Sequence, residues 1–256
     1  GRASGLERLG RGLEDAVALS GQPETVPVGV GATHPGLVAP AGESTGSLRL
    51  SVTQGRSGVQ RGVSGAHERR RPVWIHRDAL AVARKALPAL DALQIPYQAD
   101  LTLCGDSAGG CMAAYTRQAL QHDASLPLTH QILVYPCLDM THSFPSVQEN
   151  CNTQTGFTPA KMTWYFNQCF RPGDDRRDAS PLFGELSADM PATLVLTTQF
   201  CPFRDEGRDY VRRLAEKGVR AETYNYGNMV HSYLNFEKIC YDEICDTYRR
   251  MADFLQ

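Results

Sequence analysis

The segment GDSAG at residues 105–109 constrains the fold of this chain more than any other feature, because it joins two stretches of opposite character. The run LTLC at 101–104 is short and apolar, as is typical of a buried strand, and residues 108–121 fit a helix. A strand that passes directly into a helix needs a sharp turn, and the two glycines permit a tight backbone there. Such a turn raises the hydroxyl of Ser107 above the end of the strand, which makes this serine a candidate nucleophile.

From residue 78 onward, helical patterns alternate with short apolar runs. A helix is expected over residues 78–93, interrupted at Pro88. Further strands are predicted at 132–135, 193–198 and 221–226, and further helices at 157–170, 204–217 and 242–255. Short apolar strands separated by helices imply an α/β fold, with a mostly parallel sheet that helices cover on both faces.

The composition changes abruptly at Trp74. Residues 1–73 contain no Phe, Tyr, Trp, Cys, Met, Ile, Lys or Asn, and all of these types occur later. A segment without aromatics or Ile has little from which to build a core, so disorder is one interpretation. Most of the missing types have AT-rich codons, so a frameshifted stretch of a GC-rich gene is the other. We therefore divide the chain into an atypical low-complexity segment, residues 1–73, and an α/β domain, residues 74–256, with a cap insert at 144–190.

Charge, hydropathy and cysteine spacing argue against several kinds of partner. The formal net charge of -2 gives no reason to expect nucleic acid, and no apolar run approaches the roughly 18 residues of a membrane span. The chain starts at Gly1 without an initiator Met or a signal region, so we interpret it as a processed or fragmentary cytoplasmic protein. Its cysteines form no CxxC pair and no zinc-ligand spacing, which indicates reduced core cysteines and no metal site.

Several motifs in register carry a resemblance to a known family. They are GDSAGG at 105–110, QILVYP at 131–136, DASPL at 178–182, PFRDEG at 202–207 and NMVHSY at 228–233. Together they resemble the hormone-sensitive-lipase-like esterases (bacterial family IV) of the α/β-hydrolase fold, over residues from about 78 to 256. The resemblance implies a serine carboxylesterase that hydrolyses short-chain acyl esters through an acyl-enzyme. It implies a small-molecule ester as the partner and no cofactor, and it is compatible with a homodimer.

The same resemblance assigns roles to three residues. Ser107 would be the nucleophile, and His231, in the loop after the last predicted strand, would be its base. The backbone N–H of Ala108 would donate to the oxyanion. The family's N-terminal strands are missing or unrecognisable here, so the first recognisable strand has an exposed edge unless residues 1–73 supply a neighbour.

Two departures from the family pattern concern the catalytic machinery. Cys201 occupies the position of the catalytic acid, for which Asp205 is the nearest substitute in sequence. The His-Gly-Gly-Gly stretch that supplies oxyanion donors is absent, and the nearest approach, His34-Pro35-Gly36, contains a proline without an N–H. The sequence therefore leaves two functions open: an impaired serine carboxylesterase, or a catalytically inactive scaffold that is a binding protein or a defective gene product.

Overall fold

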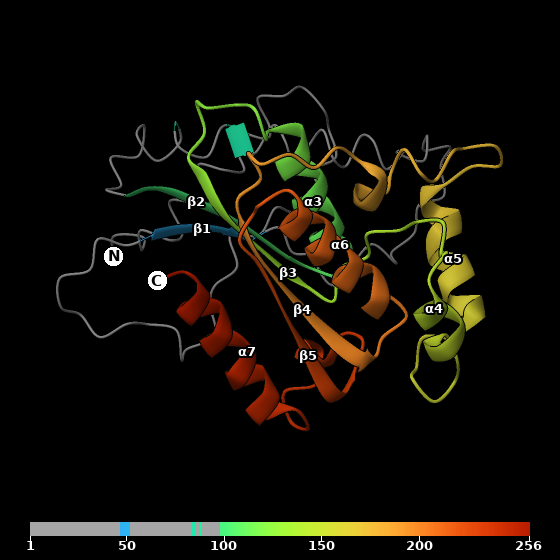
Figure 1. The fold of residues 1–256 in the computed structure, drawn as a ribbon. Helices are drawn as coiled ribbons and strands as arrows, with labels where there is room; N and C mark the ends of the chain where they lie inside the picture. The colour runs from blue at the N-terminus through green and yellow to red at the C-terminus, as the bar shows by residue number, and fades with distance from the viewer. Residues whose placement is uncertain (1–46, 52–82, 85–87, 89–97) are drawn as a thin grey trace, which may run out of the picture.

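One parallel sheet of five strands forms the centre of the part of the chain that the structure describes (Figure 1). The computed structural model describes residues 47–51, 83–84, 88 and 98–256. The strands lie in chain order, and each pairs in parallel with the next. They are β1 (Ser47–Ser51), β2 (Gln98–Asp106), β3 (Leu128–Val134), β4 (Ala192–Phe200) and β5 (Ala221–Val230). This confirms the predicted α/β fold with a parallel sheet.

Helices pack on both faces of the sheet. The longer ones are α3 (Ala108–Ala119), α5 (Pro159–Cys169), α6 (Arg204–Glu216) and α7 (Tyr241–Phe254), and α4 (Pro145–Asn150) is short. Helices α3 and α6 belong to the hydrophobic cluster on one face of the sheet, while α7 belongs to the cluster on the other face (Figure 1). The predicted helix over 78–93 lies mostly outside the described residues.

Alternation along each strand divides the core between these two faces. Leu133 of β3 and Val195 of β4 pack with α3 and α6. Their chain neighbours Ile132 and Leu194 pack with α7 instead. Successive side chains of a strand point to opposite faces, so a strand covered on both sides must be apolar at nearly every position. This is why these strands were recognisable in the sequence as short continuous apolar runs.

The N-terminal segment supplies one strand to this sheet. β1 pairs with β2, with Leu48 opposite Leu101 and Leu50 opposite Leu103. It therefore adds a fifth strand to the four that the apolar runs predicted, and it covers the edge of β2 that would otherwise be exposed. The rest of residues 1–73 lies outside the described residues, including the His34-Pro35-Gly36 stretch.

The connection between β3 and β4 carries α4 and α5, which lie together beyond the end of the sheet (Figure 1). Thr158 caps α5, since its hydroxyl accepts the backbone N–H of Lys161 at 3.2 Å, and Pro159 occupies the first turn. The helix predicted at 157–170 is thus present as α5, whereas α4 was not predicted. We expect this connection to act as the cap insert proposed for residues 144–190.

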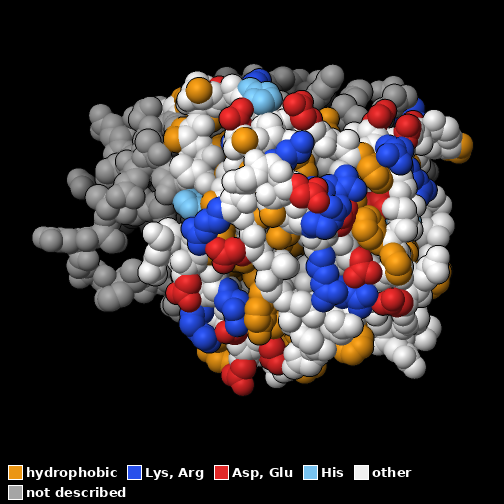
Figure 2. Space-filling model, viewed as in Figure 1, with side chains coloured by type: hydrophobic (Ala, Val, Ile, Leu, Met, Phe, Trp, Pro, Cys, Tyr) orange, Lys and Arg blue, Asp and Glu red, His pale blue; other side chains and the backbone are white. Residues whose placement is uncertain are grey.

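Acidic and basic side chains are interspersed on the face of the molecule that Figure 2 shows. Many of them form ion pairs within α6, such as Arg213 with Asp209 at 2.7 Å. Within the described part of the chain, no helix combines the length and the apolar character that crossing a membrane requires.

The β2–α3 turn depends on the absence of a side chain at Gly105, which gives a testable prediction. A Cβ atom there would lie 2.2 Å from the carbonyl oxygen of Gly109, which is backbone and cannot move aside. We expect Gly105→Ala to lower the free energy of unfolding by about 3 kcal/mol, at the upper end of the usual cost of overpacking. Urea unfolding measures it, with Gly227→Ala as the matched control, because a Cβ at Gly227 meets nothing within 4 Å. Equal stability of the two variants would contradict the prediction.

Candidate active site

Ser107 lies between the last residue of β2 and the first residue of α3, with φ 54° and ψ -117°. A non-glycine residue with positive φ is strained, and such strain persists only where the surrounding structure over-determines the backbone. Here the N–H of Ser107 donates to the carbonyl of Val134 at 2.9 Å. Its own carbonyl accepts the N–H groups of Cys111 and Cys137, both at 3.2 Å. The backbone of Ser107 is thus held by β3, by α3 and by the segment after β3, and its side chain projects from a fixed turn.

The hydroxyl of Ser107 meets the imidazole of His231. The distance from Ser107 Oγ to His231 Nε2 is 2.9 Å, although 124 positions separate the two residues in the sequence. His231 follows β5, so both residues leave the sheet at the carboxyl ends of parallel strands. In open α/β sheets, ligands bind at this edge.

Cys201 completes the row of hydrogen-bonding groups. Its Sγ lies 3.1 Å from Nδ1 of His231, and the backbone N–H of Phe203 donates to the same sulfur at 3.3 Å. The Cys201 side chain is fully buried, and this burial raises the pKa of the thiol well above its ordinary value. The group in contact with Nδ1 of His231 is therefore a neutral thiol at physiological pH.

A neutral thiol does not fix the tautomer of His231. If Nδ1 carries the proton, it donates to the sulfur and leaves Nε2 free to accept the proton of Ser107. If the S–H of Cys201 donates to Nδ1, then Nε2 carries the proton and cannot act as a base. An ionised carboxylate can only accept a hydrogen bond, so it would keep the proton on Nδ1. A thiol can donate or accept, so it permits both tautomers.

His231 is held neutral by its surroundings. Burial, and then the positive charge of Lys161, lowers the pKa of His231 to about 3. The rings of Tyr135, Phe157 and Phe203 lie 4.9, 5.3 and 5.1 Å from the imidazole, centre to centre, and exclude water from it. Little in this environment would stabilise an imidazolium ion.

The carboxylates that follow Cys201 are engaged elsewhere. Asp205 accepts hydrogen bonds from Arg204 Nε at 2.8 Å and from the backbone N–H of Ser146 at 3.1 Å. Glu206 is fully buried and accepts the N–H of Leu138 at 2.6 Å, and burial raises its pKa well above the ordinary value. Both carboxylates hold the β3–β4 connection against α6, which gives each a structural role.

The N–H of Ala108, predicted from the sequence as an oxyanion donor, lies at the start of α3. Ala108 is the first residue of α3, where backbone N–H groups have no acceptor within the helix and carry the positive end of the helix dipole. This is suitable geometry for an anion beside Ser107.

The rings around His231 were not singled out from the sequence. Tyr135 ends the second apolar run, directly before Pro136, and its hydroxyl donates to Asp106 at 3.3 Å. Its place at the carboxyl end of a parallel strand was the available signal. Phe157 comes from the cap insert and had no such signal. Among the described residues, no group of three or more His, Cys, Asp or Glu side chains could hold a metal ion.

The chain resembles esterases in sequence along part of its length. Carboxylesterase NlhH of Mycobacterium tuberculosis is 32% identical over 145 residues, which are 53% of this chain and 44% of that protein. Ethyl acetate hydrolase of Pseudomonas putida is 29% identical over 168 residues, which are 63% of this chain and 51% of that protein. The chain thus spans about half or less of the length of these curated relatives.

Solved structures agree with the sequence comparison. A hyperthermophilic esterase from the archaeon Pyrobaculum calidifontis superposes with a TM-score of 0.63 at 30% identity, over 70% of this chain and 59% of that chain. EstE1, a thermostable carboxylesterase cloned from a metagenomic library, gives a TM-score of 0.63 at 27% identity, over 70% of this chain and 62% of that chain.

A family model described as the alpha/beta hydrolase fold matches residues 67–235, which is more than half of the sequence. The chain therefore belongs to the α/β-hydrolase fold family, among the hormone-sensitive-lipase-like esterases that its motifs resemble.

Proposed function

We propose that this chain hydrolyses carboxylic esters through an acyl-enzyme on Ser107. The observation that carries the proposal is the 2.9 Å contact between Ser107 Oγ and His231 Nε2 at the carboxyl edge of the sheet. In the proposed reaction, Nε2 takes the proton from Oγ as the oxygen attacks the ester carbonyl, and the N–H of Ala108 donates to the oxyanion. His231 then returns the proton to the leaving alcohol, and water releases the acid by the same steps in reverse.

We expect slow turnover because Cys201 occupies the position of the catalytic acid. A catalytic acid keeps the histidine in the productive tautomer and stabilises the imidazolium that forms, and its loss costs about 10⁴-fold in a serine protease. Cys201 is buried and neutral, so it does neither. Burial and the charge of Lys161 lower the pKa of His231, and the neutral thiol supplies no negative charge to oppose them.

Short acyl esters are the substrates that we propose. The relatives support this class, since one is named for ethyl acetate and others for aryl or general carboxylic esters. The rings of Tyr135, Phe157 and Phe203 give the surroundings of His231 an apolar character that suits an uncharged ester.

A non-catalytic scaffold is the second candidate, and the thiol at position 201 is the observation that favours it. The fold alone does not choose between these functions, since the same architecture hosts both enzymes and binding proteins. The experiments below therefore measure chemistry at Ser107 directly.

The first experiment is hydrolysis of p-nitrophenyl acetate and p-nitrophenyl butyrate by the full chain, with Ser107→Ala as the control. We expect slow turnover that Ser107→Ala abolishes, because the hydroxyl is the only proposed nucleophile. A burst of p-nitrophenol that matches the protein concentration would report the acyl-enzyme. Turnover that is equal in both proteins, or absent from folded protein, would favour the non-catalytic scaffold.

The second experiment restores the acid. We expect Cys201→Asp to raise kcat/KM by about 10²-fold or more, because the carboxylate would accept from Nδ1 and stabilise the imidazolium. Cys201→Ser is the matched control, since a hydroxyl is neutral like the thiol and should give no comparable gain. If the aspartate variant is folded and no more active than the serine variant, the acid position does not limit the rate.

The pH profile of the same pair gives a separate prediction. His231 acts as a base only when it is neutral, so activity falls as pH drops through its pKa. With the pKa lowered to about 3, kcat/KM of the original protein should not fall as the pH drops from 8 to 5. In Cys201→Asp, the new carboxylate raises the pKa of His231, so the fall in activity should move to higher pH. Identical profiles would contradict this account of the imidazole.

Asp205 provides a test of the substitute acid. We expect Asp205→Asn to lower the free energy of unfolding by about 1–3 kcal/mol, because it weakens the buried contacts with Arg204 and Ser146. Serine-dependent kcat/KM of the folded variant should change by less than about threefold. A loss as large as that of Ser107→Ala would instead identify Asp205 as the working acid.

A further inference from the structure

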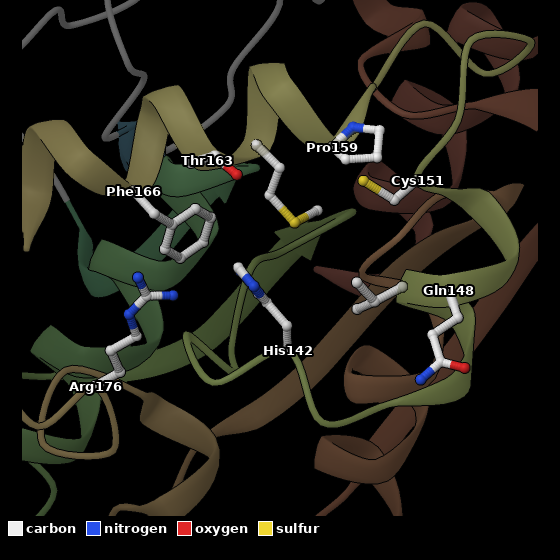
Figure 3. A pocket seen from close by; sticks show the side chains of 9 residues that line it. His142, Gln148, Cys151, Pro159, Thr163, Phe166 and Arg176 are labelled. Atoms are coloured by element: carbon white, nitrogen blue, oxygen red, sulfur yellow. The ribbon is translucent and has the colours of Figure 1, made fainter.

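A cavity lies in the cap insert, apart from Ser107 and His231. Its volume is about 400 Å³, within the usual range for small-molecule sites. The walls come from α4, from α5 and from the two loops that contain His142 and Arg176 (Figure 3). A cavity of this volume can hold a ligand of roughly a dozen non-hydrogen atoms.

Helix α5 separates this cavity from the catalytic histidine. Pro159, Met162 and Phe166 lie three and four positions apart, so they share one face of the helix, and that face lines the cavity. Lys161 projects from a different face, from which its charge lowers the pKa of His231. Phe157, just before the helix, also contacts His231. The cavity is therefore distinct from the proposed ester site.

Among the described residues that line the cavity, Arg176 carries the one positive charge. Its guanidinium lies 5.4 Å from the ring of Phe166 and 5.3 Å from that of Phe170, centre to centre. These two rings are nearly parallel, at 10°, and 6.0 Å apart. Contact with ring faces fixes the guanidinium plane while leaving its N–H edges available, which is how arginine recognises planar anions.

Neighbouring carboxylates do not neutralise Arg176. Asp174 and Asp175, in the same loop, accept the backbone N–H groups of Arg171 and Arg177. Asp139, behind the cavity wall, accepts four hydrogen bonds from the backbone and hydroxyl groups of Thr141 and Ser143. Within the described residues, no ion pair or side-chain hydrogen bond engages the guanidinium of Arg176.

His142 forms the neighbouring part of the wall as a neutral group. The turn built on Asp139 holds His142 at φ 59° and packs its ring 4.2 Å from that of Phe166, centre to centre. Burial, and then the charge of Arg176, lowers the pKa of His142. Its Nε2 atom is buried without a hydrogen-bond partner among the described residues. The polar end of the cavity thus combines one cation with one neutral, unsatisfied imidazole.

The remainder of the wall is apolar, chiefly Val147, Cys151 and Met162. We propose that this cavity binds a small monocarboxylate with an aliphatic or aromatic body, with its carboxylate against Arg176 and its body between α4 and α5. One guanidinium matches one carboxylate, whereas a phosphate dianion would bring a second charge among apolar side chains. The proposal does not depend on turnover at Ser107.

Isothermal titration calorimetry of the full chain with 4-phenylbutyrate tests the proposal. We expect a Kd of about 1 mM or tighter, and affinity for the uncharged analogue 4-phenylbutanol at least about tenfold weaker. Arg176→Gln should weaken 4-phenylbutyrate binding by about tenfold or more. Arg177→Gln is the matched control, because it removes the same charge one residue away, from a guanidinium that lies over Phe183 instead.

Two further variants locate the binding. Thr163→Trp fills the cavity from an exposed position on α5, so it should abolish binding without unfolding the protein, which the thermal midpoint checks. Ser107→Ala should bind as the original protein does. Equal losses in Arg176→Gln and Arg177→Gln, full binding by a folded Thr163→Trp variant, or no heat up to about 10 mM ligand would each overturn the proposal.

Discussion

The backbone of Ser107 is the point on which the rest of the described structure depends. Its N–H bonds to β3, and its carbonyl accepts from α3 and from the segment after β3, so one residue ties together three neighbouring elements. The positive φ of Ser107 is stable only because these bonds and the close approach of Gly105 to Gly109 leave no alternative. The same constraint that orders the centre of the sheet therefore also presents the hydroxyl to His231.

The contact between Cys201 and His231 has the geometry of a catalytic triad but lacks the charge of a carboxylate. Serine, imidazole and thiol stand in a hydrogen-bonded row with ordinary distances, so position alone gives no sign of a defect. The difference lies in charge, because a buried neutral thiol neither selects a tautomer nor stabilises an imidazolium. Under the proposed function, this chain would keep the geometry of a catalytic triad without the negative charge of the acid.

The cap insert shows how one helix can serve two sites. Lys161 on one side of α5 and Phe157, two positions before the helix, supply a charge and a ring near His231, while another face of α5 lines the cavity beside Arg176. Both environments contain aromatic rings, but the first surrounds a neutral base, whereas the second holds a guanidinium that pairs with no carboxylate among the described residues.

The sequence by itself determined the fold class and the turn at Ser107. Buried parallel strands must be apolar on both faces, and a strand-to-helix turn needs glycine, so both are local requirements that the residues record. His231 was also found, because its loop follows the last strand in the family order. The alternation at residues 48–52 was only a weak β-like signal, and the tertiary structure decided that this stretch pairs with β2. The tertiary structure also decided that Asp205 contacts Arg204 rather than His231, and that His142 and Arg176 line one cavity. Each of these depends on which groups packing places beside one another, and the periodicity of the sequence does not specify such contacts.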